Sequence, residues 1–170
     1  MLDIPAFASP QDAAYYKTTS APLFCWDIAN PALEKRVQIH NDIEQLESLV
    51  LTHNWHLGID YKAMLIHNHT LIVTNLSEEI IWASSSFHAM TGHNVDAAIG
   101  MTPSFLQGEK TSIQTKLFIR EKLANFENLE TRILNYRKNR ETYWCGIKIF
   151  PIQTLLGNVT HYIAVEKEVN

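Results

Sequence analysis

Apolar residues recur three or four positions apart between residues 31 and 54. They are Leu33, Val37, Ile39, Ile43, Leu46 and Val50. This spacing is that of one face of an α-helix. Asn30 can cap such a helix, and Pro31 suits its first turn. The pattern predicts a long amphipathic helix over 31–54, whose apolar stripe, continued by Trp55, packs either on its own domain or on a second copy of the chain.

The segment before this helix, residues 1–29, has no sustained period of either kind. It contains Pro5, Pro10 and Pro22 among small and aromatic residues. Such a composition predicts an extended lead-in with at most one short helix.

Beyond the long helix the pattern becomes typical of β-structure. Apolar strand-forming residues fill 70–74 and 80–83, and the polar segment NLSEE between them predicts a hairpin turn. Three further strands are predicted at 129–137, 142–152 and 159–167, separated by the turn-forming segments KNRE and LLGN.

Helical spacing occurs between the second and third predicted strands, at 84–91, 95–99 and 112–125. Consecutive strands with short connections pair antiparallel, and the helical middle then crosses one face of the sheet. We therefore expect an α+β fold: a five-stranded antiparallel sheet with helices on one face, plus an N-terminal helical extension. The expected division is an extension at 1–60 and a domain at 61–170, with a cavity between helices and sheet.

Composition narrows the class of protein. A length of 170 residues with 46% hydrophobic content fits one domain plus an extension. The net charge of −4, from interspersed acidic and basic residues, lacks the cationic patch that nucleic acid requires. No apolar run reaches the length of a membrane span, and the first residues do not resemble a signal peptide. We expect a cytoplasmic protein that binds neither nucleic acid nor membrane.

The residues offer few signs of catalysis or metal binding. Cys25 and Cys145 are far apart, which predicts two reduced thiols and no zinc motif. The pairs His53 with His56 and His67 with His69 have no cysteine or carboxylate cluster to complete a metal site. No nucleophile elbow, zinc-protease or P-loop motif is present, so we expect no metal site and no enzymatic activity.

Several separated motifs make residues 70–168 resemble a PAS domain of the light-oxygen-voltage (LOV) subclass found in phototropins. The motifs are IIWASSSFHAMTG with the later Gly100, SFLQG at 104–108, the pair Ile119–Arg120, NYRK at 135–138, the pair Tyr143–Trp144, Pro151, and YIAVE at 162–166. Their consistent spacing makes the resemblance specific. It implies the PAS fold and a sensory role.

The resemblance implies a flavin mononucleotide in the cavity, which blue light joins to a cysteine just before the family's R-F-L-Q motif, which reads SFLQ at 104–107 in this chain. Pro103 stands at that position. Proline has no nucleophile, so the family's photochemistry is excluded at this residue. Haem is disfavoured, because residues 104–130 contain no histidine to serve as an axial ligand.

The other family positions divide into retained and changed ones. Arg120, Gln107 and Asn135 match a phosphate arginine, the FLQ glutamine and a sheet asparagine. Thr102, Ser104, Cys145 and Glu166 replace a ribityl-contacting asparagine, a second phosphate arginine, a second sheet asparagine and a signal-transmitting glutamine. With Pro103, these are the candidate cofactor-binding residues. For two of these residues an ordinary structural role is as good an explanation as ligand binding. Arg120 can form an ion pair on the surface, and Asn135 can satisfy the edge of a sheet.

The changed positions weaken flavin binding. Losing one charge-assisted hydrogen bond of about 1.5–3 kcal/mol lowers affinity by roughly one to two orders of magnitude. An ionised Glu166 accepts hydrogen bonds but donates none.

Three functions follow from these observations. The first is a stand-alone sensory or regulatory PAS module, homodimeric, acting through pocket occupancy and an unidentified signalling partner. The second is a flavin-binding blue-light photoreceptor without a cysteinyl adduct, in which nearby Tyr or Trp reduces the excited flavin. The third is a protein-interaction domain whose pocket is filled by its own side chains. A yellow protein favours the second function, and a structure without a cavity favours the third.

Overall fold

The computed structural model describes residues 30–170, so the lead-in predicted over 1–29 and the Cys25 thiol lie outside the described residues. Residues 38–170 form one compact unit, in which the sheet described below lies. The helix predicted over 31–54 is observed as α2 (Pro31–His53). Its cap is also confirmed, because Asn30 Oδ1 accepts a hydrogen bond from the backbone N–H of Ala32 at 3.1 Å.

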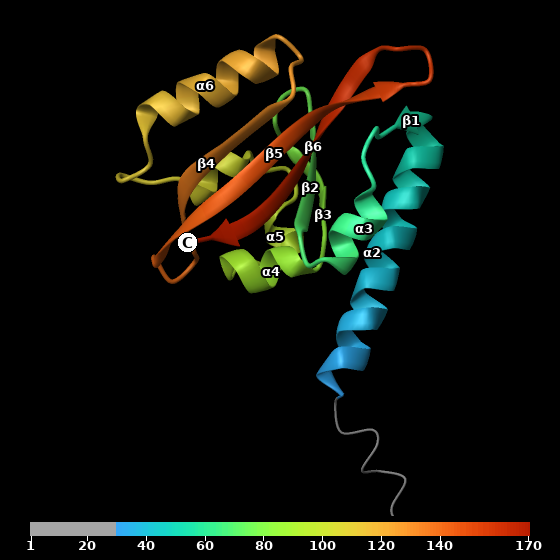
Figure 1. Cartoon of the computed structure of the whole chain (residues 1–170), viewed down its shortest axis with the longest axis horizontal. Helices are drawn as coiled ribbons and strands as arrows, with labels where there is room; N and C mark the ends of the chain where they lie inside the picture. The colour runs from blue at the N-terminus through green and yellow to red at the C-terminus, as the bar shows by residue number, and fades with distance from the viewer. Residues whose placement is uncertain (1–29) are drawn as a thin grey trace, which may run out of the picture. The chain divides into compact units, whose positions relative to one another are not determined.

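The sheet is antiparallel throughout. Its strands are β1 (Trp55–His56), β2 (Thr70–Asn75), β3 (Ile80–Ala83), β4 (Leu129–Tyr136), β5 (Thr142–Thr154) and β6 (Val159–Val169). The strands run in the order β1-β5-β6-β2-β3, and β4 pairs with β5. The predicted α+β class and antiparallel sheet are confirmed (Figure 1).

The number of strands differs from the prediction of five. A sixth strand, β1, pairs with the end of β5 through Trp55 opposite Thr154 and His56 opposite Gln153. Two residues are too few to show the alternation by which a strand is recognised in sequence.

The predicted hairpin between β2 and β3 owes its turn to one asparagine. Asn75 Oδ1 accepts from the backbone N–H groups of Ser77 and Glu79, both at 2.9 Å. Asn side chains often stabilise turns in this way. The turn brings Glu78, with a φ of 63°, to the end of the hairpin.

The helical middle of the chain contains the three helices that were expected, and a 3-10 turn besides. They are α4 (Ser86–Thr91), α5 (Val95–Ala98), the 3-10 turn η2 (Pro103–Leu106) and α6 (Ile113–Ala124). A further short helix, α3 (Tyr61–Ile66), precedes β2 and was not predicted. Ser112 Oγ caps α6 by accepting from the Thr115 N–H at 3.2 Å. None of the helices in residues 30–170 combines the length and hydropathy of a membrane span.

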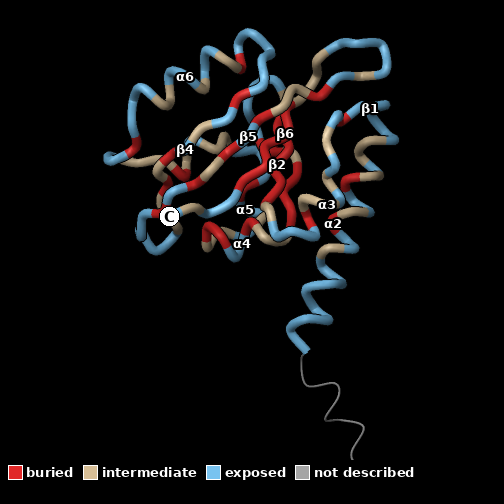
Figure 2. Tube along the Cα trace, in the orientation of Figure 1, coloured by how far each residue is buried: buried red, intermediate tan, exposed pale blue. Residues whose placement is uncertain are grey.

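Strand β6 lies in the middle of the sheet, between β5 and β2. Side chains of a strand alternate between its faces. Tyr162 and Ala164 therefore join an apolar cluster with α4, α5, η2 and α6, whereas Ile163 and Val165 join a second cluster on the opposite face. Because both faces are covered, residues 162–166 are buried without a break, and Figure 2 shows the buried positions concentrated along β2 and β6.

The second cluster corrects the expectation that helices cover only one face of the sheet. α4, α5 and α6 do cover one face, but α2 and α3 cover the other. Leu46 of α2 is completely buried there, against strand residues such as Leu71 and Ile163. Polar contacts reinforce the packing: Trp82 Nε1–H donates to Gln45 Oε1 at 2.9 Å. The boundary at residue 60 stays a prediction.

Candidate functional site

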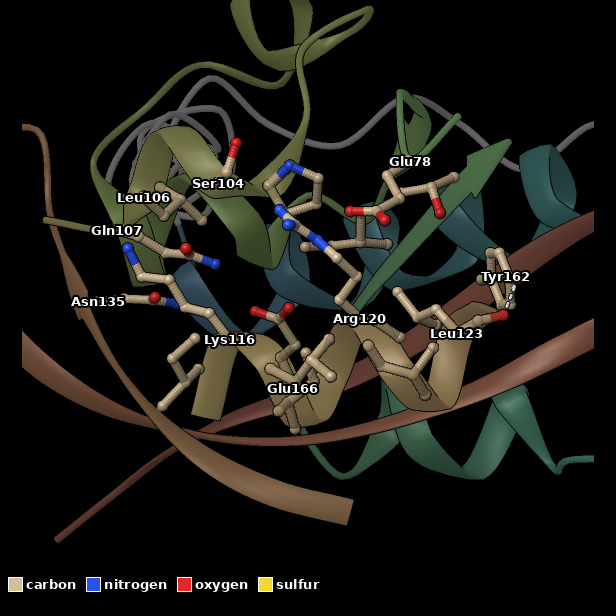
Figure 3. Close-up of a pocket in the computed structure, with 18 residues that line it drawn as sticks. Glu78, Ser104, Leu106, Gln107, Lys116, Arg120, Leu123, Asn135, Tyr162 and Glu166 are labelled. Carbon is tan, nitrogen blue, oxygen red and sulfur yellow. Dashed lines mark hydrogen bonds between the residues drawn. The ribbon is translucent and has the colours of Figure 1, made fainter. Parts of the chain in front are cut away.

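A pocket lies between the inner face of the sheet and the elements η2 and α6 (Figure 3). Its volume is about 130 Å³. A single water needs on the order of 10–15 Å³ of such space, so the pocket has room for a small organic molecule. Its apolar walls are Ile72, Leu106, Ile119, Leu123, Ile133, Ile147, Ile149 and Ala164.

Most of the site residues predicted from the sequence meet in this pocket. Six of the eight line it: Pro103, Ser104, Gln107, Arg120, Asn135 and Glu166. Thr102 and Cys145 do not belong to the lining. The Thr102 hydroxyl forms a hydrogen bond with the Ser104 hydroxyl at the start of η2.

Pro103 occupies the first position of the 3-10 turn η2 and forms part of the pocket wall. Its fixed φ suits a helical first turn. The structure therefore has a ring of carbon atoms where the resemblance implies a reactive sulfur.

Glu166 is the buried acid of the pocket. It is 3% exposed, belongs to the central strand β6, and points into the middle of the cavity in Figure 3. Within residues 30–170 its carboxylate forms no ion pair. Burial raises the pKa of this carboxyl group to about 7, although the Cys145 hydrogen bond acts in the opposite direction. Near neutral pH the group is therefore partly protonated.

Cys145 lies on the same sheet face as Glu166 but contributes no surface to the cavity. Its thiol is free and completely buried, and Sγ donates to Glu166 Oε2 at 3.4 Å. Burial, followed by the neighbouring carboxylate, raises the pKa of the thiol well above its usual range. The thiol is thus a hydrogen-bond donor to Glu166 and a poor nucleophile.

Tyr143 and Asn135 extend this polar region. They are opposite each other on β5 and β4, and both are buried. The Tyr143 hydroxyl has no hydrogen-bond partner among the described residues, and burial, followed by the charge of Glu166, raises the pKa of its phenol. The sequence analysis named Tyr143 as part of a motif but not as a site residue, although Tyr143 precedes Cys145 by two residues and therefore shares its face of the sheet.

Two basic residues of α6 border the pocket. Lys116 and Arg120 are four residues apart, so they lie on the same side of the helix. Neither forms an ion pair within the described part of the chain. In Figure 3 both extend upward from α6, and Lys116 points towards Gln107. The sequence analysis did not name Lys116 as a site residue, although its spacing of four residues from Arg120 was a signal that could have identified it. Glu78 also borders the pocket.

No metal centre is found among residues 30–170, since no three His, Cys, Asp or Glu side chains lie close enough together to hold an ion. His53 instead stacks on Trp55, with ring centroids 4.6 Å apart.

Comparison with known proteins gives consistent results. Residues 68–170 match the family described as a PAS domain. A blue-light-activated histidine kinase of Brucella anthropi is 33% identical over 90 residues, which are 53% of this chain and 18% of the kinase. Phototropin-1B of Oryza sativa subsp. japonica is 33% identical over 111 residues, which are 64% of this chain and 12% of the phototropin. The chain thus spans less than a fifth of either relative.

Solved structures show the same relationship. A light-oxygen-voltage domain studied with a flavin analogue has a TM-score of 0.61 and 28% identity, covering 64% of this chain and 83% of its own. The light state of the blue-light photoreceptor Aureochrome1 LOV has a TM-score of 0.59 and 26% identity, and the match covers 66% of this chain and 90% of the Aureochrome1 chain. The light-state dimer of the fungal blue-light photoreceptor Vivid has a TM-score of 0.57 and 20% identity, and the match covers 59% of this chain and 78% of the Vivid chain. At this identity the likeness shows the shared fold alone.

Proposed function

This chain belongs to the PAS domain family, and from that premise we propose that it is a sensory and regulatory module that responds to a small molecule in its pocket. The observation that supports this proposal is the pocket itself, where Glu166 is a buried polar group between apolar walls. Ligand sites commonly combine apolar walls with a few polar groups.

Strand β6 offers a route from the pocket to the outside of the domain. Glu166 and Ala164 face the pocket, whereas Ile163 and Val165 on the same strand pack in the cluster that contains Leu46 of α2. A ligand that displaces β6 therefore also displaces the surface on which α2 packs. This arrangement couples occupancy of the pocket to the position of the helix.

The output of this coupling acts through contacts with other proteins. Leu33, Val37 and Leu51 of α2 are exposed apolar residues, and exposed apolar stripes on helices are typical of protein contacts. We propose a homodimer that uses this helix or the sheet surface, and a signalling partner that is still to be identified. We also propose that the chain is cytoplasmic and has no catalytic activity of its own.

Mass analysis of the purified protein tests the proposal. A small molecule should be released from the wild-type protein on denaturation. Ala164→Phe, which fills the pocket from β6, should abolish the release, whereas Ala97→Phe on the exposed side of α5 should not. Release of the same molecule from Ala164→Phe would show that it binds elsewhere.

A second candidate is a flavin-binding photoreceptor without an adduct. It is favoured by the presence of Gln107, Arg120 and Asn135 in the pocket lining. The pocket does not fit the adduct chemistry implied by the resemblance, because Pro103 forms the wall and the Cys145 thiol is not part of it. A yellow purified protein with a flavin absorption spectrum would support this candidate. The cavity argues against a pocket filled by the protein's own side chains.

A further inference from the structure

The pocket combines a buried acid with two basic residues that have no anionic partner among the described residues. Glu166 lies in the middle, and Lys116 and Arg120 border the pocket from α6. We propose that the pocket binds a small organic anion with an apolar body, and that Glu166 takes up a proton when the anion binds. This inference rests on the proposed function and specifies the chemical class of the ligand.

The state of Glu166 follows from its surroundings. The side chain is 3% exposed, and its one hydrogen bond within residues 30–170 comes from the Cys145 thiol, a weak donor. Most of the pocket wall near it consists of aliphatic side chains. An ionised carboxylate without a counterion is costly in such a site. The carboxyl group therefore changes easily between its acid and its anion near neutral pH, as its pKa of about 7 indicates.

The charged and titratable groups near Glu166 belong to three elements. Strand β5 contributes Tyr143 and Cys145, whose raised pKa values keep both uncharged. Helix α6 contributes Lys116 and Arg120, and the β2–β3 turn contributes Glu78. The two cations of α6 thus outnumber the one acid at the border of the pocket.

The cations make an anion the preferred ligand. Arg120 is exposed and Lys116 is half-buried. A charge-assisted hydrogen bond to a carboxylate or phosphate is the strongest contact that arginine and lysine side chains offer. The aliphatic walls suit an apolar body attached to that group. A neutral ligand would leave the cations without a partner.

An anion in this pocket shifts the protonation of Glu166. Two negative charges in one enclosed site repel each other, and a like charge nearby raises the pKa of a carboxyl group. Binding of the anion and of the proton are therefore linked, so each favours the other. Below the pKa of Glu166 the proton is already bound. Above that pKa, binding of the anion requires the Glu166 carboxylate to take up a proton.

Titration calorimetry with naphthoate and its uncharged amide, naphthamide, tests the inference. Naphthoate is ionised from about pH 6 to about pH 8, so a change in its affinity reports on the protein. We expect naphthoate to bind at least about tenfold more tightly than naphthamide near pH 6. Its affinity should then fall by up to about tenfold per pH unit above pH 7.

Variants assign these effects to residues. Glu166→Gln, which keeps the size but cannot ionise, should bind naphthoate with no dependence on pH in this range. Lys116→Gln combined with Arg120→Gln should remove the preference for naphthoate over naphthamide. Lys148→Gln, a cation exposed on the outer face of β5, should behave as the wild type does.

The outcomes separate the two proposals. Equal binding of naphthoate and naphthamide by the wild type would overturn the anion inference and leave a ligand-binding pocket in place. Dependence on pH that persists in Glu166→Gln, or that is absent in the wild type, would overturn the role of Glu166. Failure of both probes to bind would overturn the inference and count against the sensory pocket itself.

Discussion

The Sγ atom of Cys145 lies 3.4 Å from Oε2 of Glu166, and both side chains are buried on the neighbouring strands β5 and β6. The thiol satisfies one oxygen of the carboxyl group but brings no positive charge. A buried acid with such a partner is stable as the neutral group and costly as the anion. The pair therefore makes the stability of the domain depend on pH.

Glu166→Gln should stabilise the domain at high pH. The pKa of Glu166 rises from 4.5 when unfolded to about 7 when folded, so the folded state binds the proton more tightly. The carboxyl group contributes no penalty below pH 4.5, a growing one between pH 4.5 and 7, and a constant one of about 3 kcal/mol above pH 7. Urea unfolding across this range should show the variant gaining up to that amount over the wild type.

The matched control for this experiment is Glu109→Gln, at an exposed position. Its stability should follow the wild-type curve at every pH. If Glu166→Gln also runs parallel to the wild type, Glu166 is not the group whose ionisation opposes folding.

Asp42→Ala should lower the free energy of unfolding by about 2–3 kcal/mol. The Asp42 carboxylate accepts from the Ser85 N–H with both oxygens at 3.0 Å and from the Ser85 hydroxyl at 2.8 Å, which attaches α2 to the start of α4. Removing it leaves a half-buried N–H without a partner. Asn41→Ala, on the exposed side of the helix, should change stability by less than about 0.5 kcal/mol. Similar urea midpoints for the two variants would show that this attachment contributes little.

Leu46→Ala should destabilise the domain by about 2–5 kcal/mol, because Leu46 is completely buried in the cluster between α2 and the sheet. Leu51→Ala is the control, since Leu51 is 77% exposed.

A fragment of residues 61–170 should aggregate, because loss of α2 exposes the apolar face of the sheet. A soluble, cooperatively folding fragment would support a domain boundary at residue 60.

Blue light should leave the spectrum of the wild-type protein unchanged after flavin mononucleotide is added, since neither Pro103 nor Cys145 offers a reactive thiol to the pocket. Pro103→Cys alone should behave in the same way, because flavin affinity stays low. Combining it with Ser104→Arg and Glu166→Gln restores donors that the resemblance implies, and this variant should bleach and recover in the dark. Bleaching of the wild type, or stoichiometric flavin in it, would contradict this account.

The strands were predictable because turn-forming residues mark their ends. KNRE and LLGN separate β4, β5 and β6, and the polar segment after β2 contains the asparagine that stabilises its turn. Alternation within a strand separates the residues that face the helices from those on the other face of the sheet. The packing of α2 was harder to predict, since an apolar stripe is the same whether it covers its own sheet or a second chain.

Alternation alone does not show which inward-facing residues reach a cavity. Cys145 and Glu166 share a sheet face, yet only Glu166 lines the pocket. The difference depends on side-chain length and on neighbours from other elements, which no local pattern contains. Lys116 was missed for a related reason, because a lysine on a helix is usually in solvent and its nearness to the pocket depends on how α6 lies on the sheet.

The central position of β6 has a consequence for synthesis of the protein. The β2–β3 hairpin leaves the ribosome early, but its lateral partner is β6, which follows every other strand in the chain. Until β6 emerges, one long edge of β2 has no partner, and unpaired edges are prone to association. The nascent chain therefore depends on rapid completion of its last strand, or on a chaperone, to avoid pairing with its neighbours on the same messenger RNA.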